Sequence, residues 1–425
     1  MSKLHRYVLM LACWLPGMRA VAQQTSITIE ECYTLARNNF PQIKKFDLIA
    51  KSSNYSLENA SKLYLPQVSV NGQVSYQSPT VTFPDILPNV PGHVLPQLSK
   101  DQYKITADVS QLIYDGGNVS NQKDLIRANT ASQQQNVEVA LYSIKERVNQ
   151  IYFAVLLMDQ QLHQNEIKKS NLQNSADKAA AAYEYGTAFR SNVDELKAEV
   201  INADMASIDF VSTRAAYIKM LGILIGRDLG DSLKLVMPEL KLERPGINRP
   251  ELKLYDLQRN ALDVEEQRLK TDHMPRFSAF AQGGYGRPTL NFVDNSFGPW
   301  YIVGAKLTWN LGSLYTLKNN RLNLDINRES IETERETFLY NTKMSLQQQD
   351  GDLNKYQQLL KKDISAVELR TSVRKSAEAQ LSNGVITTHD YIAQVNAEDQ
   401  ARQLLILHQV QLLQAQYKIN YTSGN

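Results

Sequence analysis

Long stretches of the chain carry apolar residues at alternating steps of three and four. Residues 118–221 contain no proline and a single glycine, Gly186, and their prevailing Ala, Gln, Glu, Lys and Leu favour helix. The apolar positions keep a heptad register and are Val137, Leu141, Ile144, Val148, Ile151, Val155, Met158, Leu162, Leu172, Ala176, Ala179 and Tyr183, then Val193, Leu196, Val200, Ala203, Phe210, Tyr217 and Leu221. This pattern predicts an antiparallel helical hairpin that turns at Gly186, with rods on the order of 100 Å long.

The other faces of this hairpin are rich in amide side chains, which predicts that they contact water. The residues concerned are Gln133, Gln134, Gln135, Gln150, Gln160, Gln161, Gln164, Asn165, Asn171 and Gln173. A narrow apolar seam between two polar faces suits a wall one helix thick, wet on both sides, better than it suits a packed core.

Four shorter segments alternate apolar and polar residues with a period of two, which predicts strands with one dry and one wet face. The segments are 67–77, 103–114, 276–285 and 300–310. Aromatic residues stand at both ends, about 30 Å apart at strand rise, as in the interfacial girdles of membrane barrels. The predicted membrane-interface aromatics are Tyr76, Tyr103, Trp300, Tyr301 and Trp309.

The same order of elements occurs twice, which predicts an internal tandem repeat. Pro41-Gln42-Ile43 recurs as Pro250-Glu251-Leu252, Leu65-Pro66 recurs as Met274-Pro275, and Gly186 recurs as Gly384. The first repeat is 23–226, with helices 28–64, strands 67–77 and 103–114 and a hairpin over 118–221. An equatorial linker covers 227–248. The second repeat is 249–425, with a helix over 250–272, strands 276–285 and 300–310, a hairpin over 313–420 and a polar tail over 421–425.

Residues 1–22 have the features of a secretory signal: Lys3 and Arg6 precede an apolar run, and Ala20-Val21-Ala22 predicts cleavage before Gln23. The alternative is a lipoprotein signal acylated at Cys13, which would leave only residues 7–12 as its apolar part. Mass spectrometry of the mature amino terminus distinguishes the two.

Composition narrows the function. Removing Lys3, Arg6 and Arg19 leaves 46 − 3 = 43 basic residues against 44 acidic ones, a balance that does not indicate nucleic-acid binding. Only Cys32 remains after cleavage, so neither an intramolecular disulfide nor a thiolate zinc site is predicted. The segment 283–286, Gly-Gly-Tyr-Gly, is interpreted as a strand end rather than a phosphate loop, because no helix starts after it. Neither an enzyme nor a cofactor or metal site is predicted.

Beyond the signal, no run approaches the roughly 20 apolar residues of a membrane helix, so any membrane part is expected to consist of strands. Four strands cannot close a barrel, and open edges in lipid would leave backbone groups unpaired. Three copies would supply a 12-stranded barrel. The predicted fold class is therefore mainly α with membrane β: helical hairpins forming a hollow α-barrel, plus four strands per chain in a trimeric β-barrel.

The doubled motifs carry a family resemblance over essentially the whole mature chain. The paired proline entries, the Leu-Pro and Met-Pro steps, the exits at 115–117 and 311–312, and the turns at Gly186 and Gly384 resemble the outer-membrane efflux protein family of TolC-like channel-tunnels. The resemblance implies a homotrimer in the outer membrane of a Gram-negative bacterium, with a periplasmic extension. It also implies a periplasmic adaptor and an inner-membrane transporter, of the resistance-nodulation-division or the ABC type, as partners in tripartite efflux or secretion.

By the same resemblance, the Gly186 and Gly384 turns lie at the periplasmic tip that gates the tunnel and docks the adaptor. Asp390 takes the position of a lumen-facing aspartate, and three copies around a threefold axis would form a cation-favouring ring. The matching position in the first repeat is Asn192, followed by Asp194. The resemblance also implies a tyrosine and an arginine that latch the tip at the second turn, but this chain has Leu381 and Ile386 at those two positions. Tyr183 and Arg190 flank the first turn and could replace the latch. Arg190, Asp194 and Asp390 also fit ordinary solvated turn residues, although Asp390 fits this alternative less well than the other two.

Two alternatives belong to other classes. A periplasmic adaptor also has a signal, a coiled hairpin and β-structure, but typically one hairpin and β-domains with apolar cores. A filamentous scaffold would use coiled coils but has no need of strands with a lipid-facing side. Recovery in the outer-membrane fraction as a heat-modifiable oligomer would favour the channel.

Overall fold

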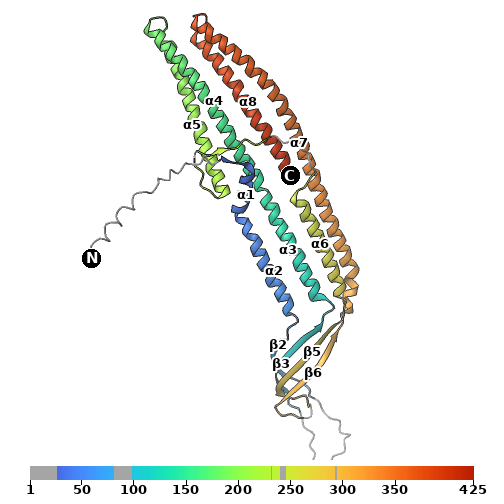
Figure 1. Ribbon diagram of the computed structural model, residues 1–425. Coiled ribbons are helices and arrows are strands. Elements are labelled where there is room, and N and C mark those ends of the chain that lie inside the picture. The colour runs from blue at the N-terminus through green and yellow to red at the C-terminus, as the bar shows by residue number, and fades with distance from the viewer. Residues whose placement is uncertain (1–25, 81–97, 231, 240–245, 292–293) are drawn as a thin grey trace, which may run out of the picture. The chain divides into compact units, whose positions relative to one another are not determined.

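A computed structural model describes residues 26–80, 98–230, 232–239, 246–291 and 294–425 (Figure 1). The predicted signal over 1–22, with Cys13 and the cleavage point before Gln23, lies outside these ranges. Contacts divide the chain into two units, and each unit draws on both predicted repeats. We call them the helical unit, which takes residues up to Phe40, Leu141–Ile247 and Ser345–Asn425, and the sheet unit, which takes Pro41–Ala140 and Asn248–Met344.

Two hairpins dominate the helical unit. The first consists of α4 (Ile144–Glu184) and α5 (Arg190–Ile225). The second consists of α8 (Thr388–Ser423) and the later part of α7 (Leu314–Ser382), a helix of 69 residues that enters this unit at Ser345. The two predicted hairpins are therefore present, although the first begins with a separate helix and the second continues through most of the predicted polar tail.

Each hairpin turns at a left-handed glycine. Gly186 has φ +75° and Gly384 has φ +69°, a region that glycine enters without steric cost. At the first turn the amide of Gly186 donates to Tyr183 O (3.0 Å) and the amide of Thr187 donates to Ala182 O (2.8 Å). The second turn repeats this pattern from Gly384 and Val385. Both turns are Schellman motifs, which satisfy the last helix carbonyls and reverse the chain.

A shared apolar core joins the two hairpins near their turns. Residues from four helices contribute to it: Leu172, Ala176, Leu196, Ala377, Tyr391, Ile392 and Val395. Several predicted seam positions of α4 are buried, among them Val148, Val155 and Leu172. Tyr152 and Phe153 are also buried, although they lie off the heptad seam. The Tyr152 hydroxyl donates to the backbone of Ile27 and Val236, and the Phe153 ring packs on Tyr417 of α8.

Helix α1 (Ile29–Asn39) starts with the predicted capping box: the amide of Glu31 donates to Thr28 Oγ1 (3.2 Å) and the amide of Thr28 donates to the Glu31 carboxylate (3.0 Å). The preceding β1 (Ser26–Ile27) pairs in parallel with β4 (Lys234–Leu235) in the predicted linker. The Tyr152 hydroxyl lies 3.0 Å from Ile27 O and 2.6 Å from Val236 O. The sequence did not predict this pairing.

The sheet unit is built on one antiparallel sheet with the order β2-β3-β5-β6. Its strands are β2 (Gln67–Tyr76), β3 (Asp101–Tyr114), β5 (Arg276–Arg287) and β6 (Gly298–Thr308), close to the four predicted segments. β3 pairs with β5 and so joins the strands of the two predicted repeats. Within the described residues, β2 and β6 are the edge strands.

The register places like faces together across all four strands. On one face, Val74 pairs with Tyr103, and Ala281 pairs with both Val109 and Val303. Large side chains on this apolar face are exposed to solvent, including Val70 at 68% and Tyr301 at 79%. The opposite, polar face carries Ser69, Asn71, Gln73, Lys104, Thr106, Asp108, Gln282 and Lys306. The predicted alternation therefore extends across the four strands as one apolar face and one mainly polar face.

The remaining elements of the sheet unit are helical. They are the 3₁₀ turn Pro41–Lys44, α2 (Lys45–Lys62), α3 (Asn118–Tyr142), α6 (Pro250–Thr271), the 3₁₀ turn Leu311–Ser313 and the first part of α7. Contacts tie them in pairs: Thr130 donates to Ser53 Oγ (2.9 Å), and Arg328 bridges Asp263 (3.0 Å) and Glu266 (2.6 Å). The predicted helices over 28–64 correspond to α1 and α2, with a 3₁₀ turn between them.

The expectation that the amide-rich faces are wet is wrong at three positions. Gln135, Gln164 and Asn165 are buried. The side-chain amide of Asn165 donates to Ala203 O (2.7 Å) across the first hairpin, and that of Gln135 donates to Pro250 O (2.8 Å). A buried amide is stable where it finds such partners, and composition does not reveal them. Of the helices in the described ranges, none is long and apolar enough to cross a membrane.

Candidate functional site

Asp390 lies in the first turn of α8 and caps that helix. Thr387 Oγ1 accepts from the Asp390 amide (3.1 Å) and donates to Asp390 Oδ2 (2.7 Å), which also accepts from the Thr387 amide (3.2 Å). These hydrogen bonds, together with the neighbouring His389, hold the pKa of Asp390 below its usual value. The carboxylate is exposed, so it remains a charged group at the surface of the turn.

The first turn has a looser arrangement. Arg190 and Asp194 are both exposed and lie 3.6 Å apart as an i,i+4 pair at the start of α5. Asn192 is half-buried, and its backbone amide donates to Phe189 O (3.1 Å). An exposed pair of this kind contributes about 0–1 kcal/mol. The first-turn residues therefore differ from Asp390, which is fixed by its cap.

Apolar side chains stand exposed beside both turns. Tyr185 is 85% exposed and Phe189 77% exposed around Gly186, and Val385 follows Gly384 at 70%. The two hairpins also meet through polar contacts at this end: His389 Nδ1 lies 3.0 Å from Glu195 Oε1, and the Ser175 and Tyr391 hydroxyls lie 3.1 Å apart.

A buried carboxylate lies further along the second hairpin. Glu398 on α8 accepts from Arg374 Nε (2.5 Å), Arg402 Nη2 (2.6 Å) and Thr371 Oγ1 (2.8 Å). Burial alone would raise the pKa of Glu398, but the hydrogen bonds from Arg402, Thr371 and Arg374 outweigh it and leave the pKa lowered. Arg374 also bridges to Glu378 (2.8 Å). The cluster joins α7 and α8.

The polar face of the sheet has its own carboxylate. Asp108, in the middle of β3, accepts from Asn71 Nδ2 on β2 (2.8 Å) and from Thr106 Oγ1 (3.1 Å), and Gln282 on β5 also donates to it. Three strands are thus tied by hydrogen bonds on this face. A row of amides, hydroxyls and charges suits contact with water or polar solutes.

Most of the predicted interface aromatics lie on the apolar face. Tyr76 and Tyr301 are 74% and 79% exposed near the β-hairpin ends of their strands, and the Tyr103 ring lies 6.0 Å from Phe297. Trp309 follows β6 at the opposite end and donates from Nε1 to His273 O (2.9 Å).

Trp300 differs from the other four, because it belongs to the polar face. It pairs with Gly284, and a Cβ at Gly284 would lie 2.5 Å from Trp300 Cζ2, so the indole ring lies over that glycine. Lys104 Nζ, also on the polar face, lies 4.6 Å from the centre of the ring. Neighbouring residues of a strand point to opposite faces, so the sequence already places Trp300 on the side opposite to Tyr301.

The sequence contains a local signal for the cap of Asp390 and for the pair of Glu398 with Arg402, but none for the contact of Glu398 with Arg374. Thr387 three residues before Asp390 is a capping-box spacing that the sequence shows directly. Glu398 with Arg402 is an ordinary i,i+4 pair. The third partner, Arg374, comes from another helix, so no local pattern reveals the cluster.

Solved outer-membrane channels have a fold similar to that of this chain. The solved outer-membrane channel OprN has a TM-score of 0.67 with this chain at 12% identity, covering 93% of this chain and 89% of that one. The CmeC outer membrane channel of Campylobacter jejuni gives 0.62 at 12% identity, covering 93% and 85%. The MtrE outer membrane channel of Neisseria gonorrhoeae, solved in an open state, gives 0.58 at 13%, covering 93% and 89%. Among curated proteins, none matches the chain.

The fold is therefore that of the outer-membrane channels, mostly helical with a few strands. Residues 32–217 match the model of the outer membrane efflux protein family, in agreement with the resemblance noted in the sequence. The description of this family names an outer-membrane efflux protein.

Proposed function

We propose that the chain is the outer-membrane channel-tunnel of a tripartite efflux or secretion system, working as a homotrimer. The observation that carries this proposal is the sheet: four strands, an exposed apolar face, a polar face, and two edge strands without a described partner. Such a sheet is unstable alone in water or lipid, and copies joined edge to edge remove the open edges.

Three copies would give a 12-stranded β-barrel whose apolar face contacts outer-membrane lipid and whose polar face lines a lumen. Tyr76, Tyr103, Tyr301 and Trp309 would then stand near the two membrane interfaces. The hairpins would form a periplasmic α-barrel. The adaptor alternative is not favoured, because an adaptor's β-domain requires an apolar core and this sheet exposes its apolar side.

The turns at Gly186 and Gly384 would form the periplasmic tip, with Arg190, Asn192 and Asp194 beside the first turn and Asp390 beside the second. The exposed Tyr185, Phe189 and Val385 offer an apolar surface for a periplasmic adaptor. An inner-membrane transporter, of the resistance-nodulation-division or the ABC type, would supply the energy, because the tunnel itself is a passive conduit.

Purification in detergent tests the assembly. The expected result is an outer-membrane protein whose native mass is three times that of the mature chain and which conducts ions in planar bilayers. A water-soluble monomer that needs no detergent would contradict the proposal.

Asp390 is expected to make the channel cation-selective, since three carboxylates at a constriction favour cations. In bilayers, Asp390→Asn should lower the cation-to-anion permeability ratio, whereas Asp390→Glu, which keeps the charge, should preserve it. Because the pKa of Asp390 is lowered, wild-type selectivity should persist at every pH above the usual carboxylate pKa. Unchanged selectivity in Asp390→Asn would remove Asp390 from the gate.

A further inference from the structure

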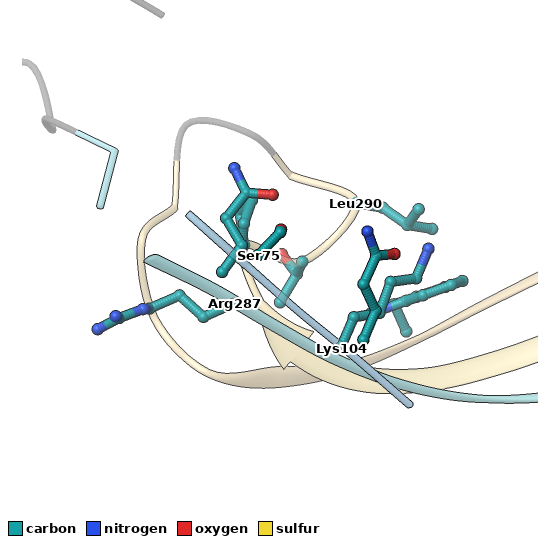
Figure 2. A pocket seen from close by; sticks show the side chains of 9 residues that line it. Ser75, Lys104, Arg287 and Leu290 are labelled. Atoms are coloured by element: carbon teal, nitrogen blue, oxygen red, sulfur yellow. The ribbon is translucent and has the colours of Figure 1, made fainter. Parts of the chain in front are cut away.

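A small cavity lies on the polar face of the sheet, near the end where β2 leaves the sheet and β5 turns towards β6. Its volume is about 220 Å³, and it is lined by Gln73, Ser75, Gln102, Lys104, Trp300 and the segment 287–290. Figure 2 shows Ser75, Lys104 and Leu290 at this cavity. A space of this size is smaller than a drug-sized pocket and suits a single ring.

Two glycines make the cavity possible. Gly284 and Gly286 lie on the polar face of β5 between Lys104 on β3 and Trp300 on β6. A Cβ at Gly284 would collide with the indole ring, and a Cβ at Gly286 would collide with the backbone of Tyr103. The Gly-Gly-Tyr-Gly segment thus leaves space above β5 for the Trp300 indole ring of the neighbouring strand β6.

The charge of the cavity comes from Lys104. Arg287 lines it only in part, because its side chain points away (Figure 2), pairs with Asp101 and lies over the rings of Tyr103 and Phe297. Lys104 Nζ lies over the Trp300 ring at 4.6 Å, and its charge also acts on the Asp108 carboxylate of the same face. The cavity therefore presents one ammonium group beside one flat aromatic surface.

The other lining groups add hydrogen-bonding capacity without charge. Gln73 and Gln102 offer amides that both donate and accept, and Ser75 and Thr289 offer hydroxyls. A flat ring for stacking, amides for polar substituents and one cation for an acidic group together define a ligand class.

We propose that this cavity is a binding site for a six-membered ring that carries a carboxylate. The ligand ring takes the place of the Lys104 ammonium over the Trp300 indole, and the displaced ammonium donates to the ligand's carboxylate. Two sources share this chemistry, acidic sugars and aromatic acids. The proposal depends only on the folded sheet and is independent of the adaptor and transporter assigned above.

Trp300 itself reports binding. The sequence has three tryptophans, Trp14, Trp300 and Trp309, and Trp14 belongs to the predicted signal. In a Trp309→Phe background, the detergent-solubilised mature protein is titrated with glucuronate and with benzoate, and with glucose, benzyl alcohol and acetate as controls. The expected result is a saturable change in Trp300 fluorescence with at least one ring carboxylate. Glucuronate alone identifies a sugar site, and benzoate alone an aromatic-acid site.

Two lysines of the polar face provide the matched comparison. Lys104→Met should weaken binding at least tenfold, the effect of losing a charge-assisted hydrogen bond, whereas Lys306→Met on the same face should leave it unchanged. Lys104→Arg keeps the cation and should retain binding, which separates loss of charge from misfolding.

Several results would overturn the proposal. They are no saturable change with either ring carboxylate, equal binding of the neutral rings or of acetate, or an equal loss in Lys104→Met and Lys306→Met.

Discussion

At the scale of single residues, Asp115 shows how one side chain sets a junction. It is 3% exposed, and it accepts from the amides of Gly117 (2.9 Å) and Val119 (2.6 Å) and from the Tyr64 hydroxyl (2.9 Å). It thereby ties the end of α2 to the step from β3 into α3. The Asp-Gly-Gly exit was visible in the sequence, but the contact with Tyr64, 51 positions earlier, was not.

Asp115→Asn should destabilise the protein by about 1–3 kcal/mol, because the NH₂ group of the asparagine side chain cannot accept the hydrogen bonds that the replaced carboxylate oxygen accepts. Burial would raise the pKa of Asp115, but the bonds from Val119, Tyr64 and Gly117 outweigh it and lower the pKa. This stabilisation should be complete above the usual carboxylate pKa and be lost as the pH falls below it. Urea unfolding at several pH values measures both effects.

Asp124→Asn, which removes an exposed pair with Arg127, is the control for this experiment and should change stability by less than about 0.5 kcal/mol. An equal loss in both variants would show that Asp115 has no special role.

At the scale of elements, heptad spacing and single glycines fix the hairpins. Periodicity identifies helices because it is a local property, and Gly186 and Gly384 mark the turns because only glycine readily takes their positive φ. The break near Ser143 between α3 and α4 has no comparable signal. The β1–β4 pair of two residues per strand is too short to give an alternation.

Gly384→Ala should lower the thermal unfolding temperature of the purified protein, since an alanine at φ +69° costs about 1–2 kcal/mol. Gly351 provides the opposite comparison within α7, where an added Cβ meets nothing within 4 Å. Gly351→Ala should therefore stabilise the helix by roughly 1 kcal/mol. Circular dichroism during heating measures both, and a shift of the same sign in the two variants would contradict this explanation of the turn.

At the scale of the whole molecule, the two faces of the sheet determine its environment. The strand alternation was predictable because a period of two is read within one strand. That β3 pairs with β5 and makes one continuous apolar face depends on residues more than 150 positions apart. The proposed trimer rests on this continuous face and on the two edge strands.

Neighbouring residues of β2 test which face meets lipid. Val70→Lys should cost roughly 2–4 kcal/mol if the apolar face spans a membrane, and the oligomer should be lost or reduced in the outer-membrane fraction. Ser69→Lys places the same charge on the polar face and should assemble normally. Heat-modifiable bands on gels measure assembly, and equal tolerance of the two lysines would exclude lipid contact for the apolar face.

The sequence by itself determined most of the helices, the four strands, their apolar and polar sides and the turn glycines, because each of these is encoded in spacings of a few residues. The tertiary structure alone decided which amides become buried, how α8 packs on α4, where the Glu398 cluster forms, and that Trp300 and Lys104 meet over two glycines. Those contacts join residues far apart in the chain. Their energies depend on distances and directions that no local pattern contains.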